Sequence, residues 1–102
     1  AKPALAVALA HRAVIEIDQR DLTRATHDVG LARSALSGVW GPDHPEWAAI
    51  ERAEALLDLA RGQDAQARAR FEGARDRLVE AGVQPCEDPL ASIEDDLSRL
   101  ST

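Results

Sequence analysis

The segment 25–36, ATHDVGLARSAL, returns 42 positions later as the segment 67–78, ARARFEGARDRL. The coinciding residues are Ala25 and Ala67, Ala32 and Ala74, Arg33 and Arg75, and Leu36 and Leu78, with Val29 opposite Phe71. The match continues upstream, where Ala13 falls on Ala55 and Pro3 on Pro45. A fixed period of this size is the signature of stacked structural repeats. The sequence therefore predicts similar units packed side by side, an architecture that usually offers binding surfaces.

The composition is that of one small globular domain built from small and aliphatic side chains. The chain has 102 residues, 45% of them hydrophobic, but only two tryptophans and one phenylalanine. Alanine has the highest helix propensity, and its small side chain lets helices approach closely. No apolar run approaches the roughly 20 residues of a membrane span. We therefore expect an all-helical fold of one domain that is not embedded in a membrane.

The net charge limits which partners the chain can bind, and the cysteine content indicates its cellular compartment. The net charge of −6 argues against nucleic acid and anionic membranes, which attract clustered Lys and Arg. Cys86 is the only cysteine, so no intramolecular disulfide can form, and we expect a cytoplasmic protein. The abundance of alanine and arginine suggests a bacterial source.

Five helices are expected from the spacing of apolar residues and from end signals. They cover about 3–19, 22–39, 45–61, 64–81 and 88–100. Asp21 is the predicted N-cap of the second helix, Asp43 or His44 that of the third, and Asp88 followed by Pro89 begins the fifth. Gly62 and Gly82 end the third and fourth helices. The apolar face of the first helix is predicted to contain Leu5, Leu9, Ala13 and Ile17, widened by Val7, Val14 and Ile15. Nothing in the chain is typical of a strand.

Two features resemble the tetratricopeptide repeat. Gly62, Ala67, Phe71 and Ala74 have its spacing of small and aromatic residues. The segment 40–48, WGPDHPEWA, is similar to the linker of kinesin-light-chain-type repeats, a subtype with a 42-residue period. Arg20 departs from the pattern in place of a glycine, as does Asp58 in place of a large apolar residue, and the second linker is shortened.

The resemblance implies an α-α superhelix of two helical hairpins and a C-terminal capping helix. Repeat 1 would cover about 3–44, repeat 2 about 45–87 and the capping helix about 88–100, all within a single domain, 1–102. Because two units are fewer than such stacks usually need, we expect the chain to be part of a longer repeat protein.

In this family the first helix of each unit lines a concave groove that binds protein segments. The residues that would line it here are Val7, Ala10, His11, Val14, Ile17, Asp18, Ala49, Arg52, Ala53, Leu56, Leu59 and Ala60. The groove would be unusually apolar, and it lacks the Lys and Asn with which some members hold a peptide C-terminus. An exposed apolar strip of this kind indicates something that covers it: the fifth helix, a second copy, neighbouring repeats or an apolar helical ligand.

No set of residues predicts a catalytic, metal or cofactor site. His11, His27 and His44 are better explained as surface or capping residues than as metal ligands, which must converge in threes or fours. Cys86 stands beside two acidic residues and has no evident base. Glu94, Asp95 and Asp96 are expected to form a solvated helix face. Trp40 and Trp47 are expected to pack around the linker.

We therefore expect a protein-interaction module rather than an enzyme, with no cofactor. Its partner would be a protein or peptide, with a homodimer as the first form to test. The alternative is a regulatory domain of a larger bacterial enzyme or transcription regulator, with the groove binding a segment of its own polypeptide.

Overall fold

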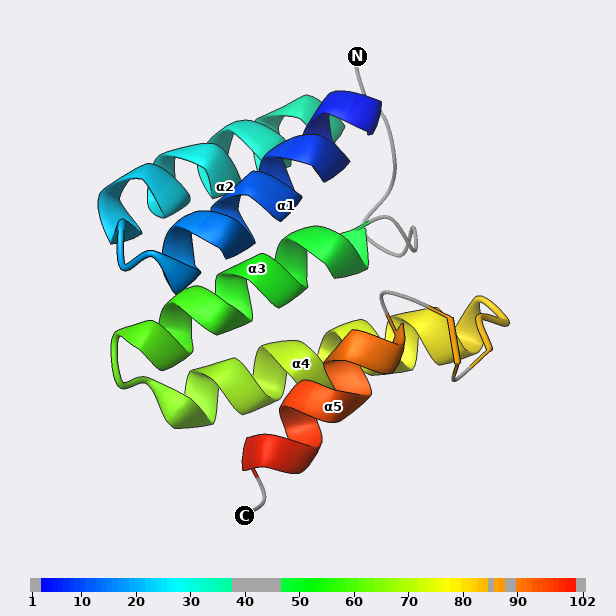
Figure 1. Cartoon of the computed structure of the whole chain (residues 1–102). Helices are drawn as coiled ribbons and strands as arrows, with labels where there is room; N and C mark the ends of the chain where they lie inside the picture. Colours follow the sequence, from blue (N-terminus) through cyan, green and yellow to red (C-terminus); the bar gives the residue numbers. More distant parts are fainter. Residues whose placement is uncertain (1–2, 38–46, 85, 88–89, 101–102) are drawn as a thin grey trace.

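The structure is a computed structural model that describes residues 3–37, 47–84, 86–87 and 90–100. The described residues form five helices and no strand, so the predicted all-α class is confirmed. Figure 1 shows α1 and α2 as one antiparallel pair, α3 and α4 as a second, and α5 lying across α4. The helices are α1 (Pro3–Asp18), α2 (Leu22–Leu36), α3 (Trp47–Ala60), α4 (Asp64–Glu80) and α5 (Leu90–Leu100).

The turns within the two pairs are built alike, 42 residues apart. Arg20 has a φ of 65° and Gly62 a φ of 77°, both in the left-handed region. After α1, the N–H of Asp21 donates to the carbonyl of Glu16 at 2.8 Å, and after α3, the N–H of Gln63 donates to the carbonyl of Asp58 at 2.8 Å. Hydrogen bonds of this reach close a helix with a Schellman motif. Arg20 thus adopts the same left-handed conformation as Gly62. Glycine reaches this conformation without a steric penalty, whereas arginine does not.

Side chains near the helix ends complete the boundaries. Asp21 caps α2 as predicted, with its carboxylate accepting from the N–H of Arg24 at 3.3 Å. Gly62 and Gly82 follow α3 and α4 with positive φ, as expected for helix-ending residues. The expected end of α2 near residue 39 and the expected caps at Asp43, His44 and Asp88 lie outside the described residues.

Two hydrophobic clusters fill the interior, and each is shared by three helices. The first unites α1, α2 and one face of α3, through Ala6, Leu9, Ala10, Ala13, Ala25, Val29, Ala32, Leu36, Trp47, Ile50, Ala53 and Leu57. The second unites α3, α4 and α5, through Ala48, Ala55, Ala67, Phe71, Ala74, Leu78, Leu90, Ile93 and Leu97. Helix α3 therefore contributes to both clusters and joins the two hairpins.

The predicted inner face of α1 is partly wrong. Leu5 is 48% exposed and Ile15 is 57% exposed, whereas Ala6 and Ala10 are buried. The reason is that α1 packs on α2 and α3 with its alanine side. Its opposite side has no neighbour among the described residues.

Helix α5 is held to the second hairpin by packing and by one ion pair. Leu90 and Ile93 are fully buried in the second cluster. Asp96 is also buried, and its carboxylate accepts from Nε of Arg52 at 2.9 Å. The expectation that Asp96 lies on a solvated face is therefore wrong, because Arg52 of α3 pairs with it. Glu94 and Asp95 are exposed, as expected.

Candidate functional site

A strip of half-buried apolar residues runs over α1 and α3, and we call it the α1–α3 strip. Its members are Val7, Val14, Ile17, Ala49, Leu56 and Leu59. Val14, Ile17 and Ala49 pack against the first cluster, while Leu56 and Leu59 pack against the second. All six were predicted to line the groove. These six residues lie on two helices, α1 and α3, that pack against each other.

A hollow of about 310 Å³ lies at one end of the α1–α3 strip. It is bounded by Ile17, Asp18, Arg20, Leu56, Leu59 and Ala60. Its lining combines aliphatic side chains with one acidic and one basic residue. A site of this chemistry accommodates an apolar side chain and fixes its orientation with a polar group.

Not every predicted groove residue contributes surface. Ala10 and Ala53 are buried, at 1% and 0% exposure, and belong to the first cluster. They cannot line a groove, because the crossing of α1 and α3 covers them. His11 and Asp18 are exposed, and Arg52 is half-buried with its guanidinium on Asp96 of α5.

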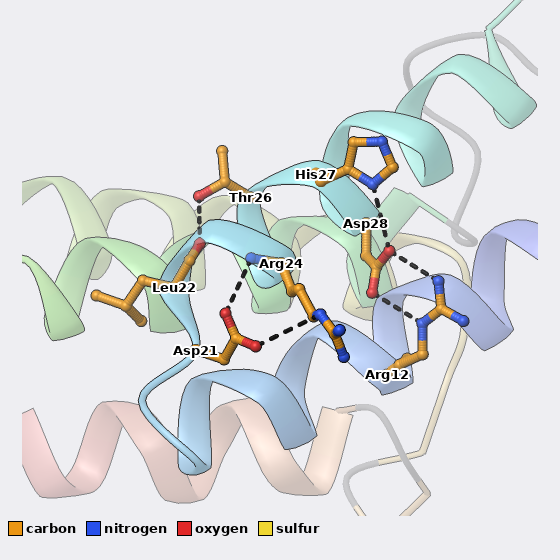
Figure 2. A network of polar contacts seen from close by, with 7 residues as sticks. All are labelled: Arg12, Asp21, Leu22, Arg24, Thr26, His27 and Asp28. Carbon is orange, nitrogen blue, oxygen red and sulfur yellow. Dashed lines mark hydrogen bonds and ion pairs between the residues drawn. The ribbon is translucent and has the colours of Figure 1, made fainter.

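A second group of side chains, between α1 and α2, is polar (Figure 2). Nε and Nη2 of Arg12 donate to the two carboxylate oxygens of Asp28, each at 2.8 Å. Nδ1 of His27 lies 3.7 Å from the same carboxylate. Asp28 is only 3% exposed, and this bidentate contact holds its pKa well below its usual range, against the opposing effect of burial. Asp28 is therefore a bound anion, not a free base.

Glu16, one turn along α1 from Arg12, lies against this ion pair. It is 8% exposed, and its Oε1 is buried without a hydrogen-bond partner in the ionised state. A hydrogen bond to Asp28 in the protonated state raises the pKa of Glu16, and burial and the charge of Asp28 raise it further. Arg12, Glu16, Arg24, His27 and Asp28 enclose a hollow of about 290 Å³.

The second hairpin holds the same contact with its charges exchanged. Arg12 and Asp28 correspond, 42 positions on, to Glu54 and Arg70, whose Oε1 and Nη1 atoms lie 3.3 Å apart. Nε of Arg70 also donates to the buried Asp58 at 2.8 Å. A perturbed pKa in a hollow often marks a functional site. Here the recurrence favours a structural role instead, since in each hairpin the pair links the first helix to the second.

Sequence reasoning did not find Arg12, Glu16 or Asp28. A usable signal was present, because opposite charges exchange places at the period of the repeat. His27, predicted to be a surface or capping residue rather than a metal ligand, is exposed but adjoins this group.

Two of the remaining site candidates, Cys86 and Trp47, belong to neither group. Cys86 is a free, exposed thiol. Trp47 is buried in the first cluster, in agreement with the expected packing role, and the guanidinium of Arg33 lies 5.2 Å from its ring centre. Trp40 and His44 lie outside the described residues.

Among the residues that the structure describes, no three or more His, Cys, Asp or Glu side chains are grouped so as to hold a metal ion. No described helix has the length and hydropathy needed to cross a membrane. No protein-family model, no curated protein and no solved structure matches this chain.

Proposed function

We propose that this chain is a protein-interaction module related to the tetratricopeptide repeats, and that its binding surface is the α1–α3 strip. The observation that carries the proposal is the hollow at the end of that strip, which Ile17, Leu56 and Leu59 line together with two charged residues. The ligand that fits it is an apolar segment, helical or extended, of another protein or of a second copy of the chain.

The energetic basis is the apolar area that remains on the strip. Val14, Ile17, Leu56 and Leu59 keep part of their surface in water although they belong to the edges of the core. Full burial of one such side chain is worth roughly 1.5–3 kcal/mol relative to exposure, so burial of the part that remains exposed on each contributes a fraction of that. Several of these at one interface can offset the entropy lost on association.

Self-association is the first form of this function to test. We expect sedimentation to show a dimer at micromolar concentration, and Leu56→Glu to give a folded monomer. Leu31→Glu is the matched control, because Leu31 is exposed on α2 away from the strip. Dimers that survive Leu56→Glu would show that the strip is not the interface.

A monomeric wild-type chain would direct the test to foreign ligands. An amphipathic helical peptide with a leucine face is then expected to shift the amide resonances of Ile17, Leu56 and Leu59, and Leu56→Glu to abolish the shifts. Shifts confined to other helices would contradict the proposed site.

A further inference from the structure

The outer edge of α1 carries an apolar pattern that is wholly buried on α3 and largely buried on α5. Leu5, Ala8 and Ile15 stand at positions i, i+3 and i+10, and all three are exposed. The same spacing recurs on α3 and α5, as Trp47, Ile50 and Leu57 and as Leu90, Ile93 and Leu100. We call Leu5, Ala8 and Ile15 the α1 edge.

In both other helices this pattern docks on a hairpin. The α3 residues belong to the first cluster, where they meet alanines and leucines of α1 and α2. The α5 residues meet the corresponding side chains of the second hairpin, including Ala48, Ala74 and Leu78. The α1 edge has no such hairpin among the described residues. Its exposed aliphatic area is therefore the counterpart of an interface that the chain forms twice.

Charge further specifies what the α1 edge accepts. Arg33 of α2 makes two contacts with α3: it lies over the ring of Trp47, and its Nη2 donates to Glu54 at 2.6 Å. The α1 residues equivalent to Trp47 and Glu54 are Leu5 and Arg12. Neither attracts a guanidinium. The side chain of Arg12 is 61% exposed and favours a carboxylate at the position where Arg33 faces α3.

A second copy of this chain does not supply the required surface. The described residues form two alanine-lined hairpin surfaces of the kind that α3 docks on, and α3 and α5 already occupy them. The occupant must therefore bring a hairpin surface of its own.

We infer that the α1 edge is an interaction surface for a further helical hairpin, one with the alanine-lined surface of α1–α2 and an acidic residue in place of Arg33. This surface is separate from the α1–α3 strip, so an experiment can disprove either proposal and leave the other intact.

The test adds such a hairpin to the full chain. A copy of residues 1–44 carrying Arg33→Glu is placed directly before Pro3, since Pro3 and Pro45 are equivalent in the repeat. We expect one cooperative melting transition above that of the original chain, and amide exchange in α1 slowed by about tenfold or more. Leu5→Glu with Ile15→Glu in the original unit should abolish both effects, yet leave the melting temperature of the unextended chain nearly unchanged.

Two further fusions make the outcome decisive. A copy that keeps Arg33 is expected to protect α1 less, and equal protection would overturn the charge assignment. Leu5→Trp, Ala8→Ile and Ile15→Leu in the original unit recreate the apolar face of α3 beside Arg12, so the Arg33→Glu copy should dock there and prove that the added hairpin folds. If that control docks while the same copy leaves exchange in α1 of the unsubstituted unit unchanged, the inference is wrong. It is also wrong if the unextended chain forms dimers that Ile15→Glu dissociates, since a second copy would then cover the α1 edge.

Discussion

Arg12 and Asp28 form a bidentate ion pair between α1 and α2, and at the equivalent positions of α3 and α4 the charges are exchanged, with Glu54 and Arg70 in a single ion contact of 3.3 Å. The exchange changes the surroundings of the acidic residue one turn further along. In the second hairpin that residue, Asp58, meets a cation, Arg70. In the first hairpin the equivalent residue, Glu16, meets an anion, Asp28.

Exchanging the charges of Arg12 and Asp28 should therefore relieve the unfavourable contact of Glu16 in the first hairpin. Asp28→Arg alone places two cations together and is expected to lower the melting temperature. Asp28→Arg combined with Arg12→Glu should recover it, because the new arginine can bind the introduced carboxylate and Glu16 together, as Arg70 binds Glu54 and Asp58. A double-mutant cycle measured by thermal unfolding checks this. Additive effects of the two substitutions would contradict the coupling.

Glu16 and Asp28 should give opposite pH dependences. Asp28 has a lowered pKa, so its stabilising contribution is present above the ordinary aspartate value and is lost as the pH falls from there through the lower folded-state value. Glu16 has a raised pKa, so its contribution is present below the ordinary glutamate value and is lost as the pH rises through the folded-state value.

Glu16→Gln removes the second of these effects and is expected to raise the melting temperature at neutral pH. The gain should shrink as the pH falls to about 3, where the wild-type carboxyl is largely protonated in the folded and unfolded states alike. Glu94→Gln makes the same charge change at an exposed site on α5 and serves as the control. A gain that is independent of pH would show that Asp28 does not act on Glu16.

A glycine in place of Arg20, in the turn after α1, should stabilise the fold. A non-glycine residue in the left-handed region costs roughly 1–2 kcal/mol, so Arg20→Gly is expected to raise the free energy of unfolding by about 1 kcal/mol. Gly62→Ala, at the equivalent position, should lower it. Gly30→Ala should raise it, because Gly30 lies within a helix and an added Cβ meets nothing within 4 Å. Urea unfolding of the three variants tests whether the φ at each position decides if the substitution raises or lowers the free energy of unfolding.

The crossing of α3 and α4 should not tolerate a larger side chain. Ala67 is fully buried in the second cluster, and Ala67→Leu is expected to destabilise the fold by about 1–3 kcal/mol through overpacking. Ala69→Leu, at an exposed position on the same helix, should cost much less. Equal denaturation midpoints for the two variants would contradict the packing of α4.

The sequence by itself determined the helices and the relation between them. Helix propensity, capping residues and the left-handed turn positions are local, so Asp21, Gly62 and Gly82 could be assigned before any packing was known. The period of 42 residues also predicted which positions are equivalent, and Arg20 indeed takes the conformation of Gly62.

Only the tertiary structure decided which apolar and charged faces are covered. Leu5 and Ile15 carry the same pattern as Trp47 and Leu57, yet the first two are exposed and the last two are buried. Asp96 was predicted to lie on a solvated face, but the folded chain places Arg52 beside it. Periodicity fixes the direction in which a side chain leaves its helix, but burial and charge pairing depend on what lies opposite, and that is set by the packing of segments distant in the chain.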